Sequence, residues 1–280
     1  MIKLDLGKPS YMGRFIGFGL TTKGEPACFY GAQGRSPPSR RRRLEIYSDE
    51  GRVFMNVNSQ TSVKEMRKQG GDPDLLLYNA MKTTKDGIIV VSNGFQTDSD
   101  PVWVGEGREK ENLKGSKPNG GIINGIISKK YGLDEAIRKN LKSCGSEVDP
   151  IRTARIAYAA DFDEDPYGGN FGIVLRPAES STDEVVCRYH ANKILDNGRN
   201  FLIFSTYGVN NPGYYDAKPP STKLMSDWTK MIHLDSINPD EIVEELFEAL
   251  PHEIMVGVAA AMRDKDQPHG FRFSKKNMVE

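Results

Sequence analysis

Short apolar runs separated by turn residues dominate this chain, and they predict β-strands. Residues 14–20 and 27–32 flank the turn-rich stretch TTKGEP, which indicates a hairpin. The runs LEIY and RVFMNV flank SDEG and predict a second hairpin. The β-branched run at residues 87–93 is typical of a buried strand. Further strands are expected in ARIAYAAD, FGIVLR, EVVCRY, FLIFSTY and IMVGVAAAM, although the alanines of the last run leave a helix open.

Helical periodicity is rarer. At residues 238–250, Asn238 suits the N-cap and Pro239 the first helical position. The apolar residues that follow lie on one stripe: Ile242, Val243, Leu246, Phe247 and Leu250. A second helix is predicted at residues 133–141 and a shorter one at 62–69, where two glycines follow.

Strands therefore outnumber helices and occur in succession. This pattern favours an α+β fold over a regular alternation of strands and helices. The chain contains no internal repeat and no linker, so residues 1–280 are predicted to form a single domain. The glycine-rich, charged segment 105–121 is predicted to be a mobile surface insertion.

The composition is that of a soluble globular protein, with 38% hydrophobic and 27% charged residues. The 38 lysines and arginines balance 38 acidic residues, so a general nucleic-acid coat protein is not expected. There is no apolar run of membrane-spanning length and no apolar leader at the N-terminus. Three widely spaced cysteines fit a reducing compartment. We therefore expect a cytoplasmic protein with no membrane partner.

One stretch departs from this neutrality: GRSPPSRRRR holds five arginines in ten positions. Pro37 and Pro38 are expected to stiffen the backbone and to exclude a helix there. Because a guanidinium group matches the geometry of phosphate, Arg35 and Arg40, which bracket the prolines, are predicted to bind one phosphate. A solvated basic loop remains an equal alternative. A nucleic-acid patch is less favoured, since no aromatic residue within the run could stack on bases.

Two further stretches carry polar residues at predicted strand ends: VVSNGFQTD at 90–98 and FSTYGVNNPG at 204–213, and the polar stretch YNAMK at 78–82 precedes the first of them. Clusters of this kind often build sites. Ordinary turn chemistry is the alternative, and the Asn-Gly pair favours it. Motifs for binding dinucleotides, nucleoside triphosphates or zinc are missing, and the four histidines are far apart. No cofactor and no metal are expected.

In this order, these segments resemble the archaeal-type stand-alone IMP cyclohydrolases. The matches are GRF near the start, RSPPSR against the family's Arg-Ser-Phe-Pro-Asn-Arg, YN at 78–79, VVSNGFQTD against Val-Val-Ser-Asn-Gly-x-x-Thr-Asp, TARIAYAA against Thr-Pro-Arg-Ile-Ala-Ala, and STY at 205–207. They span residues 13–207. The chain departs from the family at Pro37, which replaces an aromatic residue, at Ser39, which replaces an asparagine, in the insertion at 105–121 and in the C-terminal portion.

The resemblance implies a four-layer αββα sandwich like that of the N-terminal-nucleophile hydrolases. These hydrolases expose a Cys, Ser or Thr at the mature N-terminus. This chain starts with Met1-Ile2 and is therefore expected to lack that nucleophile. Cys28 is then expected to be a packed thiol in a strand.

The implied reaction is the dehydrative closure of formamido-imidazole-carboxamide ribonucleotide to IMP, a step of purine biosynthesis. The resemblance implies the catalytic residues Tyr78, Asn79, Asn93 and Lys82, with the amides stabilising oxygen charge and Tyr78, assisted by Lys82, moving a proton. It implies the substrate-binding residues Arg14, Arg35, Ser36, Arg40, Asp98, Thr206 and Tyr207. Arg41, Arg42 and Arg43 are expected to form a basic rim that steers the anion.

Two alternatives stay open: a cyclase or amidohydrolase that acts on another phosphoribosyl compound, and a non-catalytic protein that binds nucleotide or RNA. The expected partner is a small purine ribonucleotide. The sequence leaves open whether the chain forms a homo-oligomer.

Overall fold

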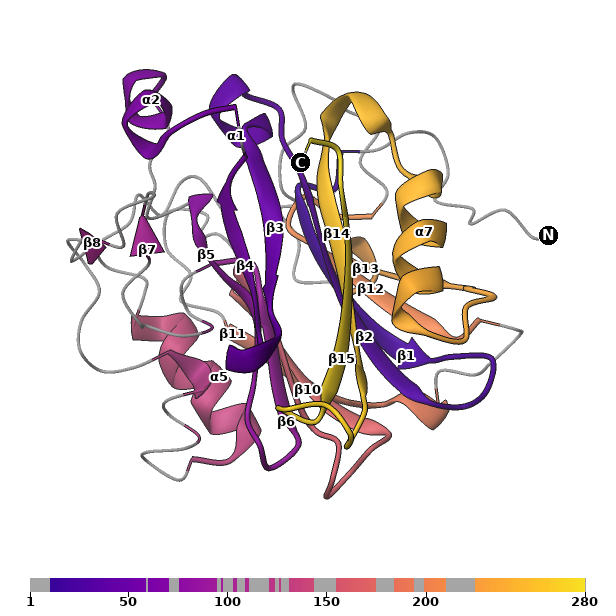
Figure 1. Ribbon diagram of the computed structural model, residues 1–280. Helices are drawn as coiled ribbons and strands as arrows, with labels where there is room; N and C mark the ends of the chain where they lie inside the picture. The colour runs from indigo at the N-terminus through magenta and orange to yellow at the C-terminus, as the bar shows by residue number, and fades with distance from the viewer. Residues whose placement is uncertain are drawn as a thin grey trace.

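The computed structural model of the protein describes residues 11–58, 60–70, 76–94, 97, 103–104, 109–110, 121–123, 126, 131–143, 155–174, 184–193, 199–209 and 225–279. Two antiparallel sheets and a few helices make up this part of the chain (Figure 1), so the α+β class is confirmed. No helix in these ranges is long and apolar enough to cross a membrane.

The first sheet has the strand order β13-β12-β1-β2-β14-β15. Its strands are β1 (Arg14–Leu20), β2 (Pro26–Gln33), β12 (Phe201–Ser205), β13 (Thr229–Ile232), β14 (Met255–Arg263) and β15 (Phe271–Asn277). The predicted hairpin of β1 and β2 is confirmed. The alanine-containing run near the C-terminus is a strand, β14, because it pairs on both sides, with β2 and β15.

The second sheet has the order β11-β10-β9-β6-β5-β4-β3. Its strands are β3 (Arg42–Tyr47), β4 (Arg52–Val57), β5 (Tyr78–Thr83), β6 (Ile88–Ser92), β9 (Arg155–Asp161), β10 (Gly168–Val174) and β11 (Glu184–His190). Among these, only β5 was not predicted. A separate ribbon pairs β7 (Trp103–Val104) with β8 (Glu109–Lys110). The remainder of the predicted insertion at 105–121 lies outside the described residues, apart from residue 121.

The three predicted helices are present as α2 (Val63–Lys68), α5 (Leu133–Ser143) and α7 (Pro239–Ala249). The Asn238 side chain caps α7 by accepting a hydrogen bond from the Glu241 amide, as predicted. Ser62 caps α2 in the same way. Short helices also occur at α1 (Pro37–Arg40) and α6 (Met225–Trp228), with 3-10 turns at η1 (Ser48–Glu50), η3 (Ala191–Lys193) and η5 (His252–Ile254).

Helix α1 corrects the expectation that Pro37 and Pro38 exclude a helix. Both prolines lie in its first turn, where a backbone N–H has no partner within the helix and its loss costs nothing. The Ser36 hydroxyl accepts a hydrogen bond from the Ser39 amide and starts the turn. The prolines therefore shape the arginine-rich stretch by beginning a helix.

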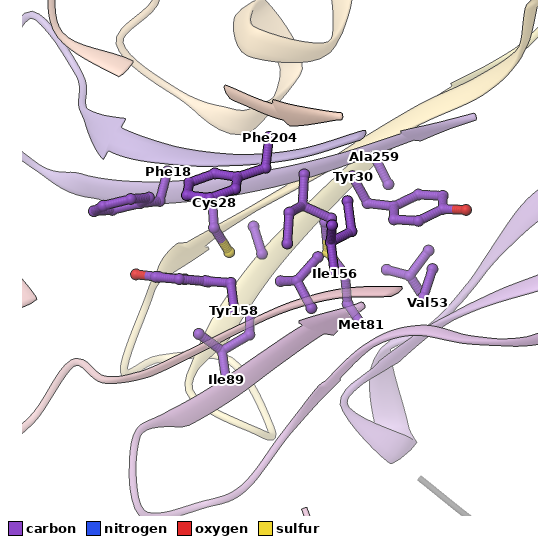
Figure 2. Packing of buried hydrophobic residues seen from close by; sticks show 14 of the residues in the cluster. Phe18, Cys28, Tyr30, Val53, Met81, Ile89, Ile156, Tyr158, Phe204 and Ala259 are labelled. Atoms are coloured by element: carbon purple, nitrogen blue, oxygen red, sulfur yellow. The ribbon is translucent and has the colours of Figure 1, made fainter. Parts of the chain in front are cut away.

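The described elements lie in the order helix, sheet, sheet, helix. Helix α7 packs on the outer face of the first sheet, and α5 packs on the outer face of the second (Figure 1). The largest apolar cluster lies between the sheets. In Figure 2 one sheet contributes Phe18, Cys28, Tyr30, Phe204 and Ala259, and the other contributes Val53, Met81, Ile89, Ile156 and Tyr158.

Cys28 is a fully buried free thiol in β2. Burial raises its pKa well above the ordinary value. The expectation of a packed thiol is therefore confirmed, and the side chain serves the contact between the sheets.

Side chains at one end of the sandwich tie the two sheets together. Arg263 at the end of β14 pairs with Asp163 in the turn after β9, at 2.6 Å. The His269 imidazole donates to the Asp49 carbonyl oxygen at 2.7 Å, and thereby joins the β14–β15 turn to the β3–β4 turn. Polar side chains gather at the opposite end.

The outer face of the β1–β2 hairpin is packed by two reciprocal pairs. Phe15 lies opposite Gly31, and Phe29 lies opposite Gly17. A Cβ atom at Gly31 would be 1.9 Å from the Phe15 ring, and one at Gly17 would be 2.1 Å from the Phe29 ring. Each ring therefore covers the glycine across from it, beneath α7.

We predict that Gly31→Ala lowers the free energy of unfolding by about 1–3 kcal/mol, because the buried Phe15 ring has no space to move aside. Urea denaturation would measure the change. Gly132→Ala is the control, since the nearest atom to its added Cβ is 3.6 Å away, and its effect should stay within about 0.5 kcal/mol. Equal effects of the two substitutions would contradict this account of the hairpin.

Candidate active site

Strand ends converge at the end of the sandwich opposite the Arg263–Asp163 pair. Strands β1, β3 and β5 begin there, and β2, β6 and β12 end there. Alternate side chains of a strand share one face. Arg14 therefore shares the inner face with Ile16, and Arg42 shares it with Leu44. Two arginines thus point into the layer between the sheets at its polar end.

Arg14 is held from two directions. Its Nη1 donates to the Asn93 carbonyl oxygen at 2.8 Å, and its backbone amide donates to the Thr206 hydroxyl at 3.1 Å. Burial opposes the charged form of the guanidinium group. The nearby Tyr78 and Tyr30 hydroxyls outweigh that penalty and raise the pKa of Arg14 above its ordinary value.

Arg42 is 2% exposed, which corrects its predicted place on a basic rim. Its Nε donates to the Ser39 carbonyl oxygen at 2.7 Å, and its Nη1 donates to the Leu76 carbonyl oxygen at 3.4 Å. Within the described ranges it makes no ion pair. Burial lowers its pKa, and the positive charge of Arg14 adds to this effect. The rim expectation suits its neighbours better, because Arg41 pairs with Glu65 and Arg43 pairs with Glu45 on more exposed surfaces.

Arg35 lies between two aromatic rings at the edge of this cluster. Its guanidinium carbon is 4.6 Å from the centroid of the Tyr11 ring and 4.7 Å from that of Tyr207. It also donates to the Tyr207 hydroxyl at 2.9 Å. Burial and Tyr207 raise the pKa of Tyr11, against the charges of Arg35, Arg14 and Arg42. Tyr11 therefore has all three guanidinium groups as electrostatic neighbours.

Two tyrosines meet deeper in the layer. Tyr30 on β2 and Tyr78 on β5 are fully buried, and their hydroxyl oxygens are 2.5 Å apart. Burial and Tyr78 raise the pKa of Tyr30 well above its ordinary value, and Arg14 and Arg42 offset this only in part. The hydrogen bond joins the two sheets, one tyrosine from each.

Two predicted catalytic residues lie on the other face of β5. Asn79 pairs with Phe54 in the cluster beneath α2, and its Oδ1 accepts from Arg52 at 3.4 Å. Lys82 pairs with Val90, which belongs to the cluster beneath α5. Alternation separates Asn79 from Tyr78, and the irregularity in the pairing of β5 with β4 turns Lys82 to the outer face as well. The structure therefore does not bring Lys82 to the tyrosine that it was predicted to assist.

The stretch after β6 forms a tight turn. The Ser92 hydroxyl donates to the Gly94 carbonyl oxygen at 3.1 Å and is also bonded to the Thr97 hydroxyl. The Asn93 side-chain oxygen accepts from the Ile156 amide at 3.0 Å. That bond extends the pairing with β9 and fixes the carbonyl that Arg14 contacts. The predicted turn chemistry is therefore present, and it also serves the cluster.

Of the other predicted binding residues, some contact the arginine cluster and some do not. Thr206 and Tyr207 contact Arg14 and Arg35, as described above. Ser36 and Arg40 are exposed on α1, where Ser36 acts as the N-cap. Asp98 lies outside the described residues.

Sequence reasoning did not find Tyr11, Tyr30 and the inward side chain of Arg42. The alternation of strand β3 was the available signal, because Arg42 lies two residues before the apolar Leu44. The described ranges contain no group of three or more His, Cys, Asp or Glu side chains that could hold a metal. A cavity of about 490 Å³ beside α5, lined by Tyr131, Asp161 and Arg188 among others, contains none of the predicted residues.

The cluster can hold an anion. Three guanidinium groups face a small region, and two of them point into the layer between the sheets. Low polarity strengthens their attraction for a negative charge that enters. The adjacent tyrosine pair can give or take a proton within the same region.

Comparison with known proteins yields one family. The family model described as IMP cyclohydrolase-like protein matches residues 11–108. No relative was found among curated proteins. The matched range contains Tyr11, Arg14, Tyr30, Arg42 and Tyr78, and it ends before two of the motifs quoted above, TARIAYAA and STY. Over residues 11–108, about a third of its length, the chain is similar to the IMP cyclohydrolase-like family.

Proposed function

We propose that the protein is an IMP cyclohydrolase of the archaeal type, which closes formamido-imidazole-carboxamide ribonucleotide to IMP and water. One observation carries the proposal: Arg14 and Arg42 lie beside the Tyr30–Tyr78 pair, and Arg35 stacks on Tyr11 next to them, within the range that matches the family. The positive groups suit the phosphate of a nucleotide, and the hydroxyls suit the proton transfers of a dehydration.

The place of the cluster supports a mononucleotide over RNA. The inner arginines lie between two sheets, where Arg42 is almost inaccessible to solvent. Contacts to RNA would need a basic surface that follows a backbone. The predicted clamp changes accordingly, with Arg42 taking the role first given to Arg40 while Arg35 and Arg14 keep theirs.

The ring closure moves two protons from nitrogen to oxygen. The carboxamide nitrogen attacks the formyl carbon and loses one proton, and the carbonyl oxygen gains one. The C–OH bond of this adduct, formed from the formyl C=O group, then breaks. The former formamido nitrogen loses its proton, and water leaves. An amide nitrogen is a poor nucleophile, so the site must hold the substrate in the cyclising conformation. Guanidinium groups can stabilise the oxygen charge that grows meanwhile.

In this proposal Tyr78 transfers a proton to the departing oxygen. No metal or organic cofactor is required by the balance of atoms. Cys28 takes no part as a nucleophile, because burial raises the pKa of its thiol and thus disfavours the reactive thiolate. The proposal includes the sandwich fold of the N-terminal-nucleophile hydrolases without their nucleophile, and a cytoplasmic site of action.

A second candidate is a cyclase or amidohydrolase that acts on another phosphoribosyl compound. Pro37 favours it, since this residue starts α1 where the family has an aromatic side chain. Such an enzyme would keep the phosphate site and change the groups around the base.

The first test is turnover. Purified protein incubated with formamido-imidazole-carboxamide ribonucleotide should form IMP, followed by absorbance and chromatography, without added metal or cofactor. Binding of IMP without turnover would favour the second candidate. If the protein neither converts this substrate nor binds IMP, the proposal is overturned.

Arg42→Met should weaken the binding of IMP about tenfold or more, because it removes a charge-assisted contact to phosphate. Isothermal titration calorimetry would measure the dissociation constant. Arg43→Met is the matched control: Arg43 is the neighbouring arginine, it pairs with Glu45 on the other face, and its loss should leave the affinity near that of the wild type. Equal weakening by both variants would contradict the phosphate site.

Tyr78→Phe should lower kcat about 100-fold with little change in KM, because the variant keeps the ring and loses the proton. Tyr158→Phe is the control, since Tyr158 is buried in the same layer and its hydroxyl points toward the other end (Figure 2). Circular dichroism and thermal melting would check that both variants fold. An unchanged kcat in Tyr78→Phe would remove Tyr78 from the mechanism.

A further inference from the structure

We propose that Tyr30 is a positioning residue: its hydroxyl donates to the Tyr78 oxygen, directs the Tyr78 proton toward the substrate and stabilises the phenolate left after proton transfer. This inference rests on the proposed function for its kinetic consequences. The hydrogen bond itself can be tested in the absence of substrate.

The geometry requires that one hydroxyl donates and the other accepts. The two oxygens are 2.5 Å apart, the rings are nearly perpendicular at 80°, and both residues are fully buried. Each hydroxyl has one hydrogen. If Tyr30 donates to Tyr78, the Tyr78 hydrogen is left to point elsewhere, which is the arrangement that a proton donor to substrate needs.

The surrounding charges decide which tyrosine donates. Among the tyrosines near them, both Arg14 and Arg42 interact most strongly with Tyr78, ahead of Tyr30. The Arg14 guanidinium carbon also lies 5.9 Å from the centroid of the Tyr78 ring. These positive groups thus lie closer to Tyr78 than to Tyr30 and favour Tyr78 as the acceptor of the hydrogen bond. Tyr30 keeps its proton and acts as the donor.

The titratable groups around the pair come from several elements. Arg14 faces it from β1 and Arg42 from β3. Tyr11, before β1, and Tyr207, after β12, interact with Arg14 from further out. Arg35 stacks between these two rings and interacts with Tyr11. Within the described ranges, the charges nearest the pair are thus positive, and they favour a phenolate.

A neutral donor to a phenolate gives a charge-assisted hydrogen bond, which is stronger than the bond between two neutral hydroxyls. The contact therefore strengthens at the moment Tyr78 loses its proton. Stabilisation that grows along the reaction raises kcat and leaves substrate binding largely unchanged.

The test is the ionisation of Tyr78 followed by NMR. Tyrosine labelled with ¹³C at the ring carbon bonded to oxygen would be introduced, and the Tyr78 signal would be assigned from its absence in Tyr78→Phe. In Tyr30→Phe the ionisation midpoint of Tyr78 should move up by about one pH unit, because the phenolate loses its donor. In Tyr158→Phe it should not move.

Kinetics give a second readout. In Tyr30→Phe, kcat at neutral pH should fall about tenfold, and the alkaline limb of the kcat profile should move to higher pH by about the same amount as the NMR midpoint. A purely structural role of Tyr30 would lower activity without moving the limb. An unchanged or lowered NMR midpoint would overturn the inference.

The two proposals fail in distinguishable ways. If the wild type forms no IMP but the Tyr78 midpoint moves in Tyr30→Phe, the proposed function is wrong and the positioning role of Tyr30 is supported. If IMP is formed but the midpoint does not move, the positioning role of Tyr30 is wrong and the proposed function is supported. Should Tyr30→Phe fold poorly, 3-fluorotyrosine placed at position 30 alone keeps the shape of the side chain and makes its hydroxyl more acidic. The stronger donor should then move the Tyr78 midpoint down, and an unchanged midpoint would overturn the inference.

Discussion

The contact between the two facing sheets decides which side chains can reach the site. Each strand turns alternate residues toward the other sheet, and along most of their length these inward residues are apolar. At one end the inward positions are Arg14, Tyr30, Arg42 and Tyr78. The same alternation that builds the core therefore builds the cluster. Together with the irregularity in β5, it leaves Asn79 and Lys82 on the outer face of that strand.

Placing two arginines at the end of an apolar layer has an energetic cost. The structure reduces that cost with carbonyl oxygens from Asn93, Ser39 and Leu76, which accept hydrogen bonds without cancelling the charge. A carboxylate at Arg42 would have neutralised the site and competed with a ligand anion. Solvation by carbonyls and tyrosine hydroxyls leaves the positive potential available. The cluster is thus suited to an anion that binds reversibly.

The fold could be predicted from the sequence to a large extent, because its strands are apolar runs between clear turn residues. Strand β5 escaped prediction because YNAMKT mixes polar and apolar residues around an irregularity in its pairing with β4. The site was harder to predict from the sequence than the fold. Arg42 sits in a run of arginines whose composition is uniform, and only its position in β3 separates it from Arg41 and Arg43. The Tyr30–Tyr78 contact joins residues 48 positions apart on different sheets, so no local sequence pattern predicts it.

That contact also couples the site to the core. Tyr30 and Tyr78 both belong to the apolar cluster between the sheets, and their hydroxyls meet only if the sheets keep their spacing. Protein interiors are close-packed and resist small changes of volume. A substitution elsewhere in the layer that moves one sheet against the other would lengthen the hydroxyl contact before it unfolded the protein. The core of this sandwich therefore helps to set the geometry of the polar cluster, and the end tied by Arg263 and Asp163 holds the sheets so that the other end can carry that cluster.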